Sequence, residues 1–262
     1  SMQKGMFYMA ETRACILSGA SGGLGREIAT QILEDAVFDA YVFLFRAIEK
    51  SSFLEEYRGE KYCIPFSLEE GKPDLTEVRL ERFQEIILVL TAFSIEPIQS
   101  LKLISKEVVE NYFKTNVLGQ IDLVQEVLHL VSSDCKIRIV SLDSGAVNQV
   151  FEGWGLYSCG KSFFNRYLEQ LSIEENIPTV LYSPGVMDTG MQTCIREKTD
   201  KNSSVAAFFT EKYKKGDLRN PKYVAKDIVE RYLKEWTAKE LREKVSSTEM
   251  RDIYLSQIQY KA

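Results

Sequence analysis

A tyrosine and a lysine stand four residues apart in the segment Tyr157-Ser-Cys-Gly-Lys161. Residues at this spacing lie on the same face of a helix. A tyrosine hydroxyl has an ordinary pKa of about 10, and a neighbouring ammonium group lowers it by favouring the phenolate. Such a tyrosine could protonate the oxygen of a carbonyl compound while hydride adds to the carbon. By itself, the same spacing is also common on ordinary helix surfaces.

Two polar residues earlier in the chain could take part in the same reaction. Ser144 comes shortly after the apolar run Lys136–Val140 and could donate a hydrogen bond where negative charge develops on an oxygen atom. Asn116 stands at the start of a long helical pattern. Either residue alone has a simpler explanation, Ser144 as a turn residue and Asn116 as a helix cap. Together, Asn116, Ser144, Tyr157 and Lys161 form the candidate catalytic set.

The chain has 262 residues but only one histidine, His129. A metal site built on two histidines is therefore excluded, a Ser-His-Asp triad would depend on this residue alone, and we expect no metal. His129 lies outside the apolar stripe of its helical pattern, so we expect it on a helix surface or at a subunit interface. With 33 basic and 38 acidic residues, the net charge of -5 gives no general attraction to nucleic acid or to an anionic membrane.

A glycine-rich turn separates an apolar run that ends at Ser18 from a helical pattern that begins at Gly25. Its glycines follow the pattern Gly-x-x-x-Gly-x-Gly. Glycine permits positive φ and close approach of the backbone to a ligand, and free N–H groups at the start of a helix attract a pyrophosphate. The turn therefore predicts a dinucleotide site formed by Gly19, Ser21, Gly23, Leu24 and Gly25. The alternative is a tight connection that binds nothing.

The sequence after the second apolar run distinguishes between two dinucleotides. Sheets that bind NAD usually place an acidic residue there to hold the ribose hydroxyls, but residues 41–48 contain no Asp or Glu. Arg46 could instead form a charge-assisted hydrogen bond with the 2′-phosphate of NADP. We therefore expect NADP(H) as the cofactor. A solvated surface arginine is the alternative.

Short apolar runs alternate with longer helical patterns along the chain. Runs that are apolar on both faces are typical of a parallel sheet covered by helices. The pattern predicts an α/β fold, a single-domain Rossmann-type doubly wound parallel sheet of six to seven strands with helices on both faces. Proline in the third run indicates an edge strand or a strand end. The expected strands are Ala14–Ser18, Tyr41–Phe45, Tyr62–Phe66, Ile86–Leu90, Lys136–Val140, Thr179–Tyr182 and a last one near Asp252–Leu255, and the expected helices include Gly25–Glu34, Val117–Val131, Phe164–Leu171 and 221–236.

We expect residues 1–10 to form an N-terminal tail, in which Ser1-Met2 resembles a cloning remnant, and residues 11–262 to form one domain. Residues 190–220 are dominated by Thr, Lys, Asn, Ser and Gly and are interpreted as a long loop. A loop of this length is either a substrate lid or a mobile surface insertion. The five cysteines are widely spaced and contain no C-x-x-C, which is typical of reduced thiols in the cytoplasm.

Taken in order, the glycine turn and the four candidate catalytic residues resemble the short-chain dehydrogenase/reductase superfamily from Ala14 to about Gly185. Within it, residues 153–161 and 182–192 are similar to segments of sepiapterin and benzil reductases. The resemblance implies that Lys161 also holds the nicotinamide ribose and that Asn116 positions water behind that lysine. It further implies cofactor contacts from Ser67, Ala92, Pro184, Gly185 and Thr189, and substrate contacts from Ser144, Trp154, Tyr157 and Met191. Sepiapterin reductases hold the pterin with an acidic residue near the C-terminus, and Asp252 stands roughly at that place; a solvated surface charge is the alternative.

Two segments depart from the superfamily pattern. After the fourth strand the usual Asn-Asn-Ala-Gly is replaced by Leu90-Thr-Ala-Phe93, and Ser67 stands where an aspartate normally meets the adenine. Because both segments should lie close to the cofactor, we expect the changes to weaken its binding without touching the catalytic set.

The sequence predicts an NADPH-dependent carbonyl reductase acting on a pterin side-chain ketone, as in sepiapterin, or on an aromatic diketone such as benzil, with Tyr157 as the general acid. The alternative is a non-catalytic NADP-binding sensor or interaction protein. Apolar residues on more than one face of the helices around 117–131 and 163–171 predict a homodimer, with a tetramer as the other possibility. The expected partner is a small carbonyl substrate, and neither nucleic acid nor a membrane.

Overall fold

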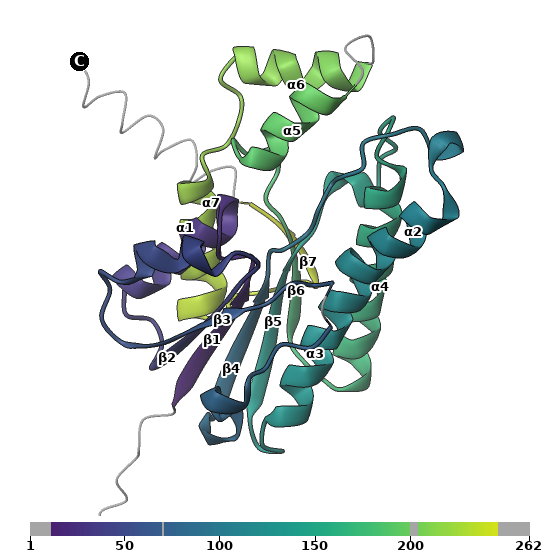
Figure 1. The fold of residues 1–262 in the computed structure, drawn as a ribbon. Coiled ribbons are helices and arrows are strands. Elements are labelled where there is room, and N and C mark those ends of the chain that lie inside the picture. The colour runs from purple at the N-terminus through teal and green to yellow at the C-terminus, as the bar shows by residue number, and fades with distance from the viewer. Residues whose placement is uncertain (1–11, 70, 200–203, 246–262) are drawn as a thin grey trace, which may run out of the picture.

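A computed structural model describes residues 12–69, 71–199 and 204–245 of the chain. Its centre is a seven-stranded sheet in which all neighbouring strands run parallel, in the order β3-β2-β1-β4-β5-β6-β7 (Figure 1). The strands are β1 (Arg13–Ser18), β2 (Ala40–Phe45), β3 (Glu60–Pro65), β4 (Glu85–Leu90), β5 (Lys136–Leu142), β6 (Thr179–Ser183) and β7 (Arg242–Lys244). The predicted Rossmann-type sheet is therefore confirmed, and Pro65 ends an edge strand as its position indicated.

Helices cover both faces of the sheet (Figure 1). On one face lie α1 (Gly23–Glu34) and α7 (Pro221–Ile228), which contact each other. The other face carries α3 (Gly119–Leu130) and α4 (Gly155–Glu174), with α2 (Lys106–Phe113) joined to α3 through a π-helical turn, Lys114–Leu118. A second π-helical turn, Val229–Lys234, continues α7.

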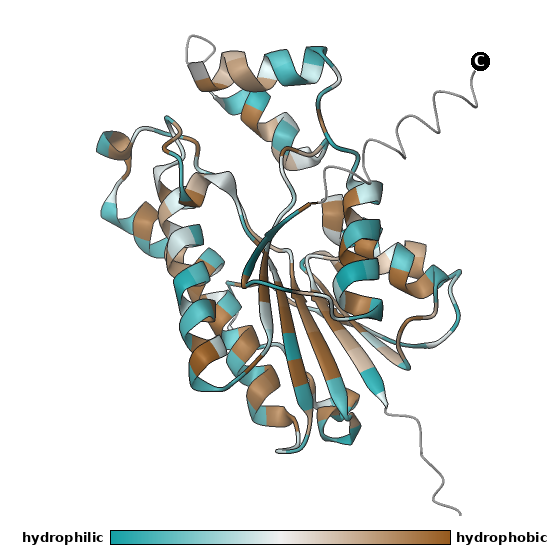
Figure 2. Ribbon diagram, turned by 180° about the vertical axis from the view of Figure 1, so that it is seen from behind, coloured by the Kyte–Doolittle hydropathy of each residue, from teal (hydrophilic) through white to brown (hydrophobic). Residues whose placement is uncertain are grey.

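Strand side chains alternate between two separate cores. In β2, Tyr41, Phe43 and Phe45 pack on the α1–α7 side, whereas Val42 and Leu44 pack on the α3–α4 side. Every residue of β2 is buried, as is every residue of β4. In Figure 2 the central strands are mostly hydrophobic, and the helices that cover them carry both hydrophobic and hydrophilic residues. A sheet covered on both faces explains why these runs lack the polar alternation of a half-exposed strand.

The order of the strands reverses between β1 and β4. From β1 the chain moves outward to β2 and β3, and then returns to β4 on the opposite side before continuing to β7. Open α/β sheets bind ligands at such a point, outside the carboxyl ends of the strands. The glycine turn after β1 and the loop after β4 both lie at this edge.

One expectation about the second half of the chain was wrong. Residues 190–220 contain two helices, α5 (Gly190–Lys198) and α6 (Ser204–Lys214), where the composition indicated a long loop. They are held by apolar residues that pack on a third core cluster, among them Ile195, Val205 and Phe209. A seventh strand that was not expected, β7, lies at the edge of the described sheet, and the strand expected near Asp252–Leu255 lies outside the described residues. The sequence pattern missed β7 because a three-residue strand of charged residues carries no apolar signal.

His129 is exposed near the end of α3, on the helix surface where the sequence placed it. Within the described part of the chain, no helix combines the length and the apolar character that spanning a membrane requires.

Candidate active site

The glycine turn brings the end of β1 close to the start of α1. Gly19 has a φ of +79°, and a Cβ atom at this position would lie 2.5 Å from the Thr91 hydroxyl oxygen. A Cβ on Gly25 would overlap the carbonyl oxygen of Gly19. Helix α1 starts after Gly22 without a side-chain cap, which leaves its first N–H groups free to meet a ligand. Of the other residues predicted for this site, Ser21 is partly exposed and Leu24 is buried under the turn.

The loop after β4, whose sequence departs from the superfamily pattern, is anchored to its surroundings by two side-chain hydrogen bonds. Thr91 donates its hydroxyl to the carbonyl oxygen of Ser18, at 2.6 Å, and thereby ties the loop to the end of β1. Gln120, a buried residue of α3, donates to the carbonyl oxygen of Ala92. The loop therefore keeps its place beside the glycine turn although its sequence departs from the family pattern.

Three of the predicted catalytic side chains meet at the carboxyl edge of β5. Tyr157 and Lys161 lie one turn apart on α4, and both are buried. The Ser144 side chain is hydrogen-bonded to the Tyr157 hydroxyl and also accepts a hydrogen bond from the backbone of Ala146, at 3.2 Å. The Lys161 ammonium donates to the carbonyl oxygen of Leu142, at 2.7 Å. The fold thus brings together three of the four residues of the candidate catalytic set.

Burial dominates the proton affinities of this cluster. It raises the pKa of the Tyr157 hydroxyl; the hydrogen bond from Ser144 opposes this change and the Asp143 carboxylate adds to it. Burial lowers the pKa of Lys161 to about 8, although the charge of Asp143 acts in the opposite direction. The expectation that Lys161 lowers the pKa of Tyr157 is therefore wrong for this arrangement, because desolvation outweighs it and the ammonium turns toward Leu142.

Phe93, which replaces the expected glycine, contacts both residues of this pair. Its ring centroid lies 4.1 Å from Lys161 Nζ, and its ring meets that of Tyr157 edge-to-face with centroids 5.8 Å apart. A buried ammonium gains cation–π stabilisation from such a ring. Phe93 therefore places an aromatic ring against Tyr157 and Lys161, at a position where a glycine would provide no side chain.

Asn116 lies in the π-helical turn between α2 and α3 and is buried. Its side-chain oxygen accepts a hydrogen bond from the Ser94 backbone, at 2.7 Å, and its amide nitrogen donates to the carbonyl oxygen of Tyr112, at 3.2 Å. The side chain thus joins the loop after β4 to the distorted helix. It is not a helix cap.

The segment after β6 runs beside the glycine turn. An ideal Cβ on Gly23 would lie 3.6 Å from Thr189 Cγ2, so the two predicted cofactor segments face each other. Arg219 holds this segment from the other side by donating its guanidinium to the carbonyl oxygen of Pro184, at 2.9 Å, and its backbone N–H to that of Val186. The neighbouring Gly185 is exposed.

Aromatic residues connect α6 to Tyr157. Trp154 stacks on Phe209 of α6, with centroids 5.3 Å apart and planes 19° apart, and meets the Tyr157 ring edge-to-face at 5.9 Å. Phe151 also packs on Trp154, and Met191 lies partly buried against this cluster. The indole N–H of Trp154 is buried and finds no hydrogen-bond partner among the described residues. Trp154 and Met191 therefore lie in a cluster that adjoins Tyr157, the candidate general acid, as the substrate prediction requires.

Two predicted binding residues, Arg46 and Ser67, lie at the ends of other strands, and a third is not among the described residues. Arg46 is exposed immediately after β2, and Ser67 follows β3, where its hydroxyl accepts a hydrogen bond from the backbone of Glu69. Asp252, predicted to hold a pterin, lies outside the described residues.

A family model described as short chain dehydrogenase matches residues 13–200. The chain belongs to the short-chain dehydrogenase/reductase superfamily. Its relatives include benzil reductase ((S)-benzoin forming) from Bacillus cereus, 27% identical over 231 residues that cover 82% of this chain and 92% of the relative. Sepiapterin reductase from Bos taurus is 28% identical over 235 residues, covering 82% of this chain and 87% of the relative. The solved structure of the KRED1-Pglu enzyme has the same fold, with a TM-score of 0.78, 24% identity and coverage of 89% of this chain and 100% of that one.

Short-chain dehydrogenases use a nicotinamide dinucleotide, and the glycine turn of this member fits one. The fit rests on the uncapped start of α1 and on the glycines that bring the backbone close to any bound group. The turn, Ala92 and the segment Pro184–Thr189 would hold the cofactor. The family assignment establishes an oxidoreductase and leaves the choice between NAD and NADP open.

Sequence reasoning missed four residues that shape this dehydrogenase site. Thr91 and Arg219 anchor the two cofactor loops, and Phe93 had been considered only as a lost glycine. Asp143 is a buried carboxylate immediately before Ser144. In the sequence, the one sign that Asp143 belongs to the site is that it immediately precedes Ser144, because its contacts come from residues that are distant in the sequence.

Proposed function

We propose that this short-chain dehydrogenase is an NADPH-dependent carbonyl reductase. The main observation is the buried cluster of Ser144, Tyr157 and Lys161 at the carboxyl edge of the sheet, next to the glycine turn. A proton donor, a hydrogen-bond donor and a cation thus lie together at the edge where a dinucleotide would be held. This arrangement suits the reduction of a carbonyl group.

The chemical roles follow from the properties of each side chain. A bound nicotinamide would supply the hydride. Because its pKa is raised, Tyr157 keeps its proton at neutral pH and can transfer it to the carbonyl oxygen. Ser144 donates a hydrogen bond to the same oxygen as negative charge develops there. The positive charge of Lys161 does not bring the pKa of Tyr157 below its ordinary value, but it would partly offset the cost of burying the tyrosinate that remains after proton transfer.

The aromatic cluster favours a flat, unsaturated ketone as the substrate. Phe93, Trp154 and Phe209 contribute rings near Tyr157, and stacked or edge-to-face contacts favour aromatic ligands. We therefore propose an aromatic diketone such as benzil, or a pterin ketone such as sepiapterin. In this proposal residues 190–220 act as a substrate lid made of α5 and α6.

The direct test measures loss of NADPH absorbance when purified protein is mixed with benzil, sepiapterin and a panel of simple ketones. We expect turnover with at least one aromatic substrate and slower turnover with small aliphatic ketones. Cofactor binding without turnover of any carbonyl compound would contradict the proposal.

Replacing Tyr157 by phenylalanine should remove the proton donor and keep the ring contacts. We expect kcat to fall by about 10²–10⁴-fold while NADPH binding, measured by calorimetry, stays close to that of the unchanged protein. Ordinary turnover by Tyr157→Phe would reject Tyr157 as the general acid.

A second candidate function is non-catalytic binding of NADP, as in a sensor or an interaction protein. The position of the Phe93 ring on the Lys161 ammonium favours it, because that ammonium is then partly covered. Calorimetric titration with NADPH separates the candidates when combined with the turnover assay: tight binding without reduction supports the second one.

We also propose that the protein acts as a homodimer, with a tetramer as the alternative, in the cytoplasm. Leu118 and Phe163 are each 51% exposed on the α2–α4 side, and Phe163 stacks edge-to-face on Phe113. Exposed apolar side chains that cluster in this way are typical of an interface between copies. All five cysteines are free thiols, which favours a reducing compartment.

A further inference from the structure

Asp143 is a buried charge that none of the proposed catalytic steps uses. It lies between β5 and Ser144, and 7% of its surface is exposed. One carboxylate oxygen accepts hydrogen bonds from the Ser144 backbone N–H, at 2.7 Å, and from the Asn165 side chain, at 2.6 Å. The other accepts from the Arg242 guanidinium, at 3.0 Å. Burying a carboxylate is costly unless it is paired in this way.

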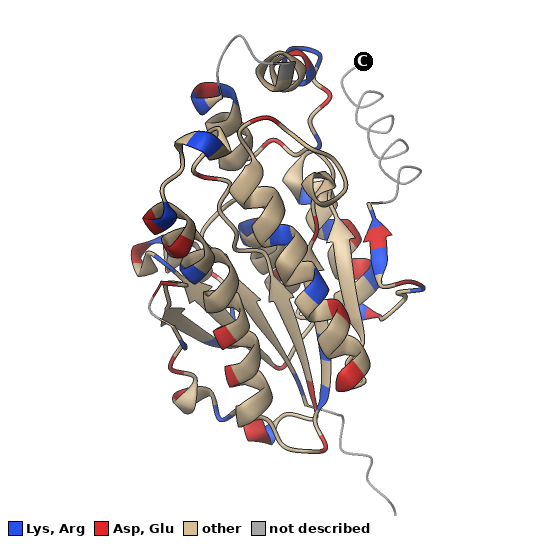
Figure 3. Ribbon diagram, turned by 90° about the vertical axis from the view of Figure 1, so that its right-hand side faces the viewer, with Lys and Arg blue, Asp and Glu red and all other residues tan. Residues whose placement is uncertain are grey.

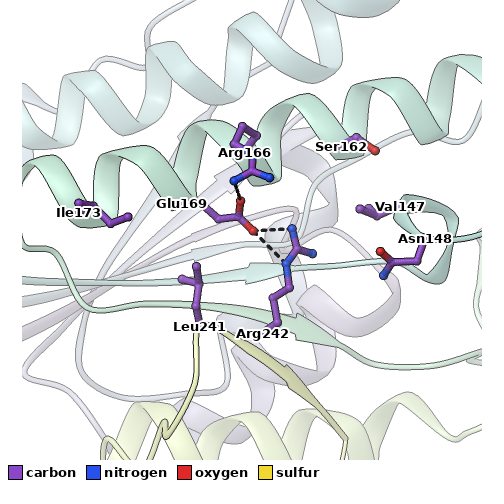
Figure 4. A pocket seen from close by; sticks show the side chains of 8 residues that line it. All are labelled: Val147, Asn148, Ser162, Arg166, Glu169, Ile173, Leu241 and Arg242. Atoms are coloured by element: carbon purple, nitrogen blue, oxygen red, sulfur yellow. Dashed lines mark hydrogen bonds and ion pairs between the residues drawn. The ribbon is translucent and has the colours of Figure 1, made fainter.

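Arg242 of β7 extends the network to the outer side of α4. Its guanidinium also donates to Glu169, at 2.9 and 2.5 Å, and Glu169 forms an ion pair with Arg166, at 2.9 Å (Figure 4). These residues line a pocket of about 650 Å³ that does not include Tyr157 or Lys161. The network thus consists of two carboxylates and two guanidinium groups, and it joins β5, α4 and β7 directly behind the catalytic serine.

The residues that face this network from α4 repeat every four positions. Tyr157, Lys161, Asn165 and Glu169 form one stripe along the helix, all of them buried. Asp143 directly follows Leu142, whose carbonyl oxygen accepts the hydrogen bond from the Lys161 ammonium. Its charge acts on both titrating members of the stripe, because it raises the pKa of Lys161 and that of Tyr157. From α2, Tyr112 faces the same site, and burial together with Tyr157 raises its pKa.

We propose that Asp143 is a positioning residue, clamped by Arg242 and Asn165, which fixes the backbone of Ser144 and balances the positive charge of the buried Lys161 ammonium. This inference rests on the proposed reductase function and adds a residue to it. Asp143 acts through Ser144 and Lys161 and does not touch the substrate. Arg242 has the opposite effect on the local charge, since it partly neutralises Asp143.

Asp143 and Arg242 carry opposite charges, so removing one or the other should shift the pH profile in opposite directions, and this provides the test. In Asp143→Asn the side chain keeps its size and loses its charge, so the alkaline limb of the pH profile of kcat should move to lower pH by about one unit. In Arg242→Gln the carboxylate remains and its neutralising partner is gone, so the limb should move to higher pH. The matched control is Asp134→Asn, an exposed aspartate just before β5, which should leave the limb in place.

A purely structural role would lower kcat in both variants without moving the limb in opposite directions. The inference would therefore be overturned if the alkaline limb of the kcat profile fell at the same pH in the original protein, in Asp143→Asn and in Arg242→Gln. If Asp143→Asn fails to fold, the double variant Asp143→Asn/Arg242→Gln can be used instead, because it removes both charges together. Its alkaline limb should lie at lower pH than that of the original protein, but at higher pH than the position expected for Asp143→Asn alone.

A second readout does not depend on turnover. Tyrosinate absorbance against pH, with the Tyr157→Phe curve subtracted, reports the ionisation of Tyr157 alone. This curve should move to lower pH in Asp143→Asn and to higher pH in Arg242→Gln. If these shifts occur but no carbonyl compound is reduced, the inference about Asp143 is supported and the proposed function is rejected. If the enzyme is active but the ionisation curve does not move, the proposed function is supported and the inference about Asp143 is rejected.

Discussion

Arg46 is the one residue on which the proposed choice of NADPH depends. It is exposed directly after β2, and the preceding strand brings no carboxylate to this edge. A guanidinium here can form charge-assisted hydrogen bonds with a 2′-phosphate, whereas the free ribose hydroxyls of NADH offer it no charge.

Replacing Arg46 by alanine should therefore raise KM for NADPH by about tenfold or more and leave KM for NADH nearly unchanged. Steady-state kinetics with both cofactors measures the effect, with Lys50→Ala as the control for a nearby exposed cation. Equal losses for the two cofactors would mean that Arg46 does not recognise the phosphate.

At the scale of elements, α6 packs against the cluster around Tyr157 mainly through the ring of Phe209. Phe209 is buried against Trp154, while its neighbour Phe208 is 46% exposed on the same helix. We expect Phe209→Ala to raise KM for an aromatic ketone by about tenfold, because an aromatic contact and its buried area are both lost, with little change in KM for NADPH. Phe208→Ala is the matched control, and an identical effect of both changes would show that the helix as a whole, not the stack, matters.

The elements also show how far the sequence could predict this fold. The central strands were found because they are apolar at every position, and α4 was found through its helical spacing. Helices α5 and α6 were missed because polar residues dominate the stretch 190–220 as a whole, and the two helices pack on a cluster that includes Trp154, a residue far away in the sequence. In the same way, the Tyr157–Lys161 pair could be read from its spacing. Asp143 and Arg242, by contrast, are 99 residues apart, and the pairing of β5 with β6 and of β6 with β7 brings them together.

At the scale of the whole molecule, the side formed by α2, α3 and α4 is the proposed contact between two copies. Between Gly155 and Arg166, Lys161 is the only charged residue of α4, and it is buried (Figure 3). Leu101, Leu103 and Val108 add exposed apolar surface near the same side of the molecule.

A charge placed in this surface should separate the two copies. We expect Phe163→Asp to sediment as a monomer at concentrations at which the unchanged protein is a dimer, because a carboxylate would have to be buried on association. Ile173→Asp introduces the same charge on an exposed position of the same helix, near its other end, and should leave the dimer intact. A monomer in all three proteins would exclude the proposed interface.

The stack of Trp154 on Phe209 also gives the protein a built-in optical reporter. The sequence contains two tryptophans, and the other, Trp236, lies away from α6, near Arg138 and Tyr232. In a Trp236→Phe protein the remaining indole emission would come from Trp154 alone. Any separation of α6 from α4 would expose that indole to water and shift its fluorescence to longer wavelength, so movement of the proposed lid could be followed in real time without an attached label.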